Sequence, residues 1–271
     1  LQMANRIKTL LKSNKVAKVF NCGQFLSHKM VEILGLHGGY DGVFIDQEHI
    51  PSILQRDIEI AAVAAKSCGM DTFVRRPAID YASAMAPLEA GAGGVLFSMI
   101  RDASHAQEAM EWVKFAPRGK RGLLGANRDG NYFLKPTKQY IKEANESTLI
   151  GMQIETEGAL DDIERIAGIE DLDFVLFGPA DMSQVLGVTG EVNHEKVWEA
   201  ISSVSKACAE AGMAWGTVPP NDEYASRAAD LGCQLFLAGH DFAAIHRGII
   251  ETKNSYPSLF GEKSELKREG A

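Results

Sequence analysis

The sequence predicts a single (β/α)8 (TIM) barrel, and two patterns indicate this fold class. Eight short apolar segments recur along the 271 residues, and helical segments separate most of them. The apolar segments do not alternate with polar residues, which is typical of parallel strands covered on both faces. The length suits one barrel of about 250 residues, so we expect one domain over residues 1–271 with an extra N-terminal helix. A doubly wound open sheet is the alternative architecture.

Each element of the barrel has a candidate segment. The expected strands are residues 16–20, 42–45, 71–74, 94–97, 149–154, 174–177, 214–217 and 234–237, of which the last two have the weaker patterns. The expected helices are residues 53–66, 81–90, 104–114, 157–166, 194–211 and 223–231. Several of these helices end at or near a glycine, such as Gly91, Gly212 and Gly232, which is common where a helix leads into the next strand.

Two segments lie outside this alternation. Residues 114–136 are rich in glycine, arginine and asparagine, and they are long for a connection in a barrel. We therefore expect them to form a lid over the functional site or a contact between subunits. The mostly polar and charged segment 255–271 is expected to be a flexible tail.

Composition excludes some classes of partner. The formal net charge is −8, so the chain has no basic footprint for nucleic acid or for an anionic membrane surface. No apolar run approaches the roughly 18 residues that a membrane helix needs, and the N-terminus lacks the apolar core of a signal peptide. The four cysteines form no C-x-x-C pair, and we interpret them as thiols of a cytoplasmic protein.

Functional groups of such barrels lie at the carboxyl ends of the strands. Candidate functional residues, several of them ionisable, follow four of the expected strands, so they should meet at one rim although they are distant in sequence. In chain order these residues are Asp46, Glu48 and His49, then Arg75 and Arg76, then Glu155, then Gly178, Pro179, Ala180 and Asp181.

Glu155 and Asp181 are the candidate metal ligands. Two carboxylates at neighbouring strand ends can bind one Mg²⁺ or Mn²⁺ ion and leave positions for water and a chelating substrate. The sequence has no cluster of sulfur or histidine ligands that would select structural zinc. Each carboxylate could instead cap the helix that follows it, and for either residue alone that is the simpler interpretation.

His49 is the candidate for proton transfer, because imidazole titrates near neutral pH. Asp46 precedes it by three residues and could fix its tautomer. We interpret the other six histidines as structural, and His240 is the least certain of them because it follows the eighth strand.

A cationic group and an anion-binding turn complete the expected site. Arg75 or Arg76 would bind a carboxylate or an enolate oxygen through the planar guanidinium fork. The backbone at Gly178, Pro179 and Ala180 leads into a short helix, where free N–H groups can bind an anion. No lysine follows an expected strand, so a Schiff-base mechanism is disfavoured.

These segments resemble the class II (metal-dependent) pyruvate aldolases of the HpcH/HpaI type, the 4-hydroxy-2-oxoheptanedioate aldolase family. The resemblance extends over roughly residues 16–256. Each matching motif is weak by itself, but five in the same order at plausible spacing are specific. They are residues 44–49 with Pro51, 74–75, 117–122, 153–156 and 178–183.

The resemblance implies reversible cleavage of a 4-hydroxy-2-oxo acid into pyruvate and an aldehyde, of the kind used in aromatic-compound or sugar-acid catabolism. It implies a divalent ion (Mg²⁺, Mn²⁺ or Co²⁺) on Glu155 and Asp181, and His49 supported by Asp46 as the base. Arg75, rather than Arg76, would contact the substrate. Gln153 and the backbone of residues 178–181 would also contact it. The family also implies a hexamer, a trimer of dimers, with the last helices exchanged between subunits.

The sequence departs from the family at Gln47, at residues 125–130 and at residues 217–220. We expect the two loops to line the aldehyde side, so the acceptor substrate stays open. Two other functions also stay open. One is a related barrel lyase that acts on a malate-like acid or a CoA thioester, although no basic cluster for a nucleotide is evident. The other is a non-catalytic barrel that binds a small acid, which the complete set of polar residues argues against.

Overall fold

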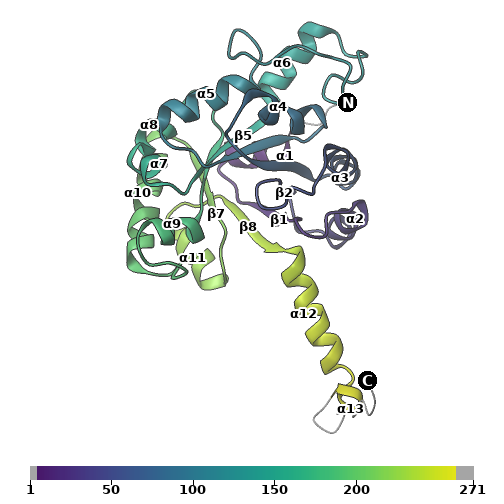
Figure 1. The fold of residues 1–271 in the computed structure, drawn as a ribbon, viewed down its shortest axis with the longest axis vertical. Coiled ribbons are helices and arrows are strands. Elements are labelled where there is room, and N and C mark those ends of the chain that lie inside the picture. Colours follow the sequence, from purple (N-terminus) through teal and green to yellow (C-terminus); the bar gives the residue numbers. More distant parts are fainter. Residues whose placement is uncertain (1–4, 261–271) are drawn as a thin grey trace.

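The computed structural model describes residues 5–260, and these residues form a closed barrel of eight parallel strands (Figure 1). Each strand pairs with the next one along the chain, and the last strand pairs with the first. The (β/α)8 barrel predicted from the sequence is therefore confirmed. The strands are β1 (Ala17–Asn21), β2 (Gly42–Asp46), β3 (Asp71–Pro77), β4 (Gly94–Ser98), β5 (Leu149–Ile154), β6 (Phe174–Phe177), β7 (Ala214–Thr217) and β8 (Leu235–His240).

Helices surround the barrel, and two further helices follow the last strand (Figure 1). In the described part of the chain no helix is long and apolar enough to span a membrane. The helices are α1 (Arg6–Lys12), α2 (His28–His37), α3 (Gln55–Ser67), α4 (Tyr81–Glu89), α5 (Ala103–Val113), α6 (Thr137–Ser147), α7 (Glu157–Asp161), α8 (Ile163–Ala167), α9 (Pro179–Val185), α10 (Glu195–Ala211), α11 (Asp222–Asp230), α12 (Asp241–Asn254) and α13 (Pro257–Phe260).

Side chains alternate along each strand between the barrel interior and the helical layer. On β3, Phe73 packs inside the barrel against Phe44 and Phe174, whereas Val74 packs in the layer between the strands and the helices. The same alternation continues to the carboxyl end of β3, where Arg75 shares the face of Phe73 and Arg76 shares that of Val74. The barrel interior is therefore apolar along the strands and polar at their carboxyl ends.

The expected N-terminal helix is α1, and it contributes to the barrel interior. Ile7 and Leu11 are buried in the same apolar cluster as the inward side chains of the strands. The Asp71 carboxylate, at the start of β3, accepts a hydrogen bond of 2.9 Å from the main chain of Ile7. Lys8 pairs with Asp173, which directly precedes β6. Because both aspartates lie where strands begin, α1 is anchored at the end of the barrel away from the carboxyl ends.

The structure refines several expected boundaries. The segment 157–166 is divided at Asp162 into two short helices, and β8 extends to His240 instead of ending at residue 237. Helices α2 and α6 were not among the expected segments, and α12 was expected only from the family resemblance. Of the expected tail, α13 covers residues 257–260, and residues 261–271 lie outside the described part.

The long loop 114–136 connects α5 to α6, on the side of the barrel where β5 begins. The side chain of Arg128 packs against Gly91, and Arg128 and Asp129 line a small polar cavity with Asn5 and Asp71. The expectation that residues 125–130 line the aldehyde side is therefore wrong within one chain. The expectation that residues 114–136 form a lid over the functional site is wrong within one chain for the same reason. A subunit contact stays a prediction.

Candidate active site

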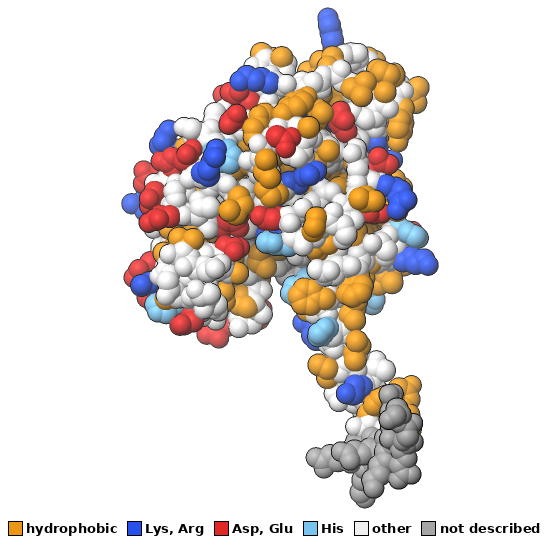
Figure 2. Space-filling view, viewed as in Figure 1, with side chains coloured by type: hydrophobic (Ala, Val, Ile, Leu, Met, Phe, Trp, Pro, Cys, Tyr) orange, Lys and Arg blue, Asp and Glu red, His pale blue; other side chains and the backbone are white. Residues whose placement is uncertain are grey.

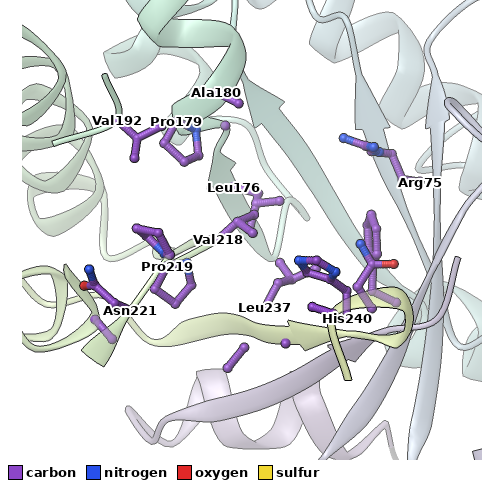
Figure 3. Close-up of a pocket in the computed structure, with 18 of the residues that line it drawn as sticks. Arg75, Leu176, Pro179, Ala180, Val192, Val218, Pro219, Asn221, Leu237 and His240 are labelled. Atoms are coloured by element: carbon purple, nitrogen blue, oxygen red, sulfur yellow. The ribbon is translucent and has the colours of Figure 1, made fainter. Parts of the chain in front are cut away.

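A cavity of 760 Å³ opens at the carboxyl ends of the strands (Figure 3). Seven of the residues expected in the site line it, and they come from four different strand ends: His49, Arg75, Gln153, Gly178, Pro179, Ala180 and Asp181. Asp46 and Glu155, the other two expected residues, are buried beside these. The barrel therefore brings together groups that are up to 135 positions apart in sequence, from Asp46 to Asp181.

Arg75 is held by two carboxylates. It is the register partner of Asp46 across β2 and β3, and its Nε and Nη2 donate to the two oxygens of Asp46 at 3.1 Å and 2.6 Å. Glu48 Oε2 lies 3.2 Å from Nε. Burial of the guanidinium works to lower its pKa, but Asp46, Glu48 and Glu155 outweigh burial and raise it. Arg75 is therefore a fixed cation at the wall of the cavity.

Arg76 lies in different surroundings from its neighbour. It does not line the cavity, and its Nε is buried without a partner among the described residues. Burial lowers its pKa, and Asp80 only partly opposes this effect. The geometry thus places Arg75, and not Arg76, where a substrate could be contacted.

Asp46 supports His49 in a different way from the one expected. Its carboxylate pairs with Arg75 and accepts hydrogen bonds from the main-chain N–H groups of Glu48 and His49 at 3.0 Å and 3.3 Å. Burial works to raise the pKa of Asp46, but Arg75 outweighs burial and lowers it. In the described structure Asp46 therefore shapes the turn that carries His49, and it is not hydrogen-bonded to the imidazole that it was expected to orient.

The His49 side chain lines the cavity and is 64% exposed. Its Nε2 lies 3.9 Å from Glu48 Oε2, which is too long for a hydrogen bond. An exposed imidazole above a fixed turn can reach a ligand in the cavity and exchange protons with solvent. This geometry is compatible with proton transfer.

Glu155 directly follows β5 and is only 4% exposed. Its Oε1 accepts a hydrogen bond of 2.8 Å from the main chain of Met99, and its Oε2 accepts one from Gln153 Nε2. Met99 has a φ of 56°, a left-handed conformation that is costly for a side chain of this kind. The strained turn after β4 thus directs an N–H group at this carboxylate.

Gly178 allows the close approach of β5 and β6 at the site. A Cβ atom at this position would lie 3.1 Å from Gln153 Nε2 and 3.2 Å from Glu155 Oε2. Helix α9 begins immediately after it with Pro179, so the N–H groups of Ala180 and Asp181 belong to a first turn and have no acceptor inside the helix. Both residues line the cavity, so these N–H groups are candidates for binding an anion there.

The carboxylates fit a divalent cation. Burial raises the pKa of Glu155, and the charges of Glu48 and Asp181 raise it further, against the Met99 N–H group and Arg75. Gln153 Oε1 is buried without a hydrogen-bond donor among residues 5–260. A cation would relieve the repulsion between the carboxylates. The described residues contain no group of three or more protein ligands arranged for a metal, so an ion held here depends on two carboxylates together with water or substrate.

Sequence reasoning assigned no role to several groups at the site. Glu48 lies in the same turn as Asp46 and His49, but nothing in the sequence indicates that its side chain turns inward to Arg75. The cavity is also lined by polar residues at the ends of β1 and β8, before β2, after β7 and on α12: Asn21, His240, Tyr40, Asn221 and Arg247. Val218, Pro219 and Pro220, from the expected loop 217–220, line the cavity, and their place on the aldehyde side stays a prediction.

The fold and the site define a barrel enzyme with an arginine, an accessible histidine and paired carboxylates at its mouth. Comparison with known proteins specifies the class. Residues 23–246 match the family model described as HpcH/HpaI aldolase/citrate lyase, which covers most of the chain. The chain belongs to this family, and its reaction class is that of a carbon–carbon lyase acting as an aldehyde-lyase.

Individual relatives support the family. The chain is 31% identical to the 2-dehydro-3,6-dideoxy-6-sulfogluconate aldolase of Pseudomonas putida, over 80% of this chain and 84% of the relative. It is 30% identical to the hydroxypyruvate/pyruvate aldolase of Delftia acidovorans, over 80% of each chain. The crystal structure of an HpcH/HpaI aldolase from Desulfitobacterium hafniense superimposes with a TM-score of 0.86 at 28% identity, covering 95% of this chain and 99% of that one.

Proposed function

We propose that the protein reversibly cleaves a 4-hydroxy-2-oxo acid into pyruvate and an aldehyde, with a divalent metal ion as cofactor. The observation that carries this proposal is that His49, Arg75 and Asp181 line one cavity from three strand ends, with Glu155, from a fourth, buried beside them. The relatives named as aldolases of pyruvate and of 2-oxo acids support it.

The pyruvate half of the substrate lies against β5 and β6 in this proposal. Glu155 and Asp181 hold the divalent ion (Mg²⁺, Mn²⁺ or Co²⁺), which would polarise the 2-oxo group when bound. The backbone of Gly178, Pro179 and Ala180 binds the carboxylate, with the first-turn N–H groups as donors. Gln153 donates to Glu155 Oε2 and so orients this carboxylate toward the ion.

His49 then transfers a proton, and Arg75 stabilises negative charge on the substrate. In the cleavage direction His49 takes the proton from the 4-hydroxyl group, and the bond between C3 and C4 breaks to release the aldehyde. The electron pair of that bond forms the enolate of pyruvate, and Arg75 stabilises the negative charge on its oxygen. Protonation of the enolate at C3 completes pyruvate. Asp46 and Glu48 keep the guanidinium in place during these steps.

Exchange of the pyruvate methyl protons with D2O tests the proposal without any aldehyde. Pyruvate incubated with the protein and Mg²⁺, Mn²⁺ or Co²⁺ should incorporate deuterium at its methyl group, and a chelator should abolish the exchange. Exchange that survives exhaustive chelation, or a borohydride-trapped adduct of pyruvate with a lysine, would contradict the metal-dependent mechanism.

We further propose that the protein is a hexamer, a trimer of dimers, in which the last helices are exchanged. Helix α12 extends from the barrel and lies beside few other elements (Figure 1), and apolar side chains line it in the space-filling view (Figure 2). Phe242, Ile249, Ile250, Leu259 and Phe260 are all exposed, in a pattern that a second chain would cover. Light scattering after size exclusion should give a hexamer, and a monomer at micromolar concentration would contradict this assembly.

A further inference from the structure

The turn that follows β4 is joined to the segment that follows β5 by two neighbouring hydrogen bonds. The main-chain N–H group of Met99 donates to Glu155 Oε1 at 2.8 Å. Thr156 Oγ1 donates to the main-chain oxygen of Ile100 at 2.6 Å. Residues 99 and 100 thus pair with residues 155 and 156 in order. The first bond reaches the candidate metal ligand Glu155, whereas the second joins two residues to which the proposed function assigns no role.

Met99 has a conformation that other contacts have to hold. Its φ of 56° lies in the left-handed region, which is unfavourable for a residue with a Cβ atom. The residue before it is fixed in β4, since the main-chain oxygen of Ser98 accepts a hydrogen bond from the Ala78 N–H group at 3.1 Å. The residue after it, Ile100, is buried in the apolar layer outside the barrel. The direction of the Met99 N–H group therefore depends on this one strained conformation.

The hydroxyl group of Thr156 is fixed on two sides. It donates to the main chain of Ile100, and it accepts a hydrogen bond of 3.1 Å from the Ala159 N–H group as the N-cap of α7. The hydroxyl therefore connects the turn after β4 to the first turn of a helix. Since Ile100 directly follows Met99, this bond opposes a relaxation of the Met99 conformation.

Gly158 allows the same two segments to pack main chain against main chain. A Cβ atom at this position would collide with the main-chain oxygen of Arg101. The turn after β4 thus contacts the start of α7 at a third consecutive residue. Three contacts in a row hold residues 99–101 against the segment that carries Glu155.

We propose that Thr156 is a positioning residue for the metal site, because its hydroxyl group keeps Met99 in the left-handed conformation and so directs the Met99 N–H group at Glu155. That N–H group binds Oε1 of Glu155, and Gln153 donates to Oε2. The carboxylate is therefore oriented before an ion arrives, and an oriented ligand binds a metal ion more tightly. This role depends on the proposed function, since it needs a divalent ion at Glu155.

The affinity for Mn²⁺, measured by calorimetry on chelator-treated protein, tests the proposal without an assay of activity. Thr156→Val keeps the shape of the side chain and removes the hydroxyl group, so it should weaken Mn²⁺ binding about 10-fold. Thr156→Ala is the second variant and should show a similar loss. Thr156→Ser keeps the hydroxyl group and should bind Mn²⁺ within about threefold of the wild-type protein. Ser27→Ala, which removes the hydroxyl cap of α2, is the matched control and should leave the affinity unchanged.

A second substitution separates positioning from helix capping. Glycine adopts the left-handed region without a steric penalty, so a glycine at position 99 needs Thr156 less to direct its N–H group. The Met99 side chain is 53% exposed within residues 5–260, so Met99→Gly leaves no internal cavity. In the Met99→Gly background, Thr156→Val should therefore weaken Mn²⁺ binding less than about threefold. A capping role alone would give the same loss in both backgrounds, because α7 is the same in each.

The outcomes distinguish the positioning role from the proposed function. If the wild-type protein binds Mn²⁺ and both Thr156→Val and Thr156→Ala bind it as tightly, the positioning role is wrong and the proposed function stands. The same conclusion follows if the loss is equal with Met99 and with Met99→Gly. If the wild-type protein binds none of the three metal ions and pyruvate shows no methyl exchange, the proposed function is wrong, and the positioning role falls with it.

Discussion

The surroundings of Arg75 require a guanidinium group at this position. Two of its N–H groups are fixed by the two oxygens of Asp46, and Glu48 lies close to Nε. The remaining N–H groups are directed by this fixed plane toward the cavity that Arg75 lines. A lysine ammonium can pair with Asp46 or reach a substrate oxygen, but it cannot do both with the same geometry.

We therefore predict that Arg75→Lys lowers kcat/KM for pyruvate-forming cleavage about 10²–10³-fold, by analogy with the loss of one oxyanion-stabilising donor. Arg76→Lys is the matched control, because Arg76 lies on the outer face of the same strand and should tolerate the change with less than a threefold effect. Steady-state kinetics of both purified variants checks this prediction. Equal losses, or a larger loss for Arg76→Lys, would reverse the assignment.

His49 is predicted to act on a proton and not on the metal. His49→Ala should lower kcat about 10²–10⁴-fold, the usual contribution of a general acid–base group. The affinity for Mn²⁺, measured by calorimetry, should change little, since Glu155 and Asp181 are unaffected. His105→Ala is not a suitable control because that ring is buried, whereas His28→Ala replaces an exposed histidine that does not line the cavity. Wild-type turnover of the His49 variant would refute the role.

The direction of the Glu48 side chain could not be predicted from the sequence. It follows β2 within the same turn as Asp46 and His49, so its neighbourhood could be read from the sequence. That its carboxylate points inward to Arg75 depends on the conformation of the turn, which Asp46 sets through main-chain hydrogen bonds. No local pattern encodes that direction.

At the scale of elements, the strands were predictable because buried parallel strands have continuous apolar character. The residues directly after them could then be assigned to one rim, and His49, Arg75 and Asp181 among them line the cavity. The helices were harder to predict from the sequence. α6 has a strongly polar sequence and follows the loop 114–136, and α12 has an apolar face with nothing to cover it in one chain. The apolar face of α12 is exposed within residues 5–260, so its pattern does not show what it packs against.

Asp241 connects α12 to the barrel. Its carboxylate is 1% exposed and accepts hydrogen bonds from the main-chain N–H groups of Phe25 and Phe242 at 2.7 Å and 2.8 Å. We predict that Asp241→Ala lowers the free energy of unfolding by about 1–3 kcal/mol, because the Phe25 N–H group is left unsatisfied and the helix loses an N-terminal negative charge.

Urea unfolding followed by circular dichroism would measure this effect. Asp241→Asn keeps an acceptor and should lose less than Asp241→Ala, and Glu251→Ala, an exposed position on the same helix, should be close to neutral. If Asp241→Ala were as stable as Glu251→Ala, the carboxylate would not be the anchor of α12.

The whole molecule has two ends with different chemistry. At the carboxyl ends of the strands, charged groups line an open cavity. At the other end, Lys8 pairs with Asp173, and Lys114 is 1% exposed with its Nζ donating to the main-chain oxygen of Asn145 at 2.6 Å. The sequence placed Lys114 at the end of a helix, where a lysine is usually solvated. Its burial depends on the loop 114–136 and α6 folding over it, which no local pattern could indicate.

Burial, together with the neighbouring charge of Lys8, lowers the pKa of Lys114 to about 7. The unfolded chain keeps the ordinary lysine pKa of 10.5, so between pH 7 and 10.5 the unfolded state binds a proton that the folded state does not. The free energy of unfolding should therefore rise with pH across this window. The full cost of the buried charge is present below pH 7 and is on the order of 5 kcal/mol, at about 1.4 kcal/mol for each pH unit.

Lys114→Met should remove this pH dependence. The variant loses the hydrogen bond to Asn145, which costs about 1–3 kcal/mol, so at pH 9.5 we expect it to be less stable than the wild-type protein. At pH 6.5 the difference should shrink or reverse, because only the wild-type protein then carries the cost of a buried ammonium group. Urea midpoints at pH 6.5, 7.5, 8.5 and 9.5 measure the trend, with the exposed Lys206→Met as the control. If the wild-type and Lys114→Met midpoints changed in parallel over this range, Lys114 would be charged in the folded state at neutral pH, and the barrel would stabilise that charge through Asp173 and the Asn145 carbonyl.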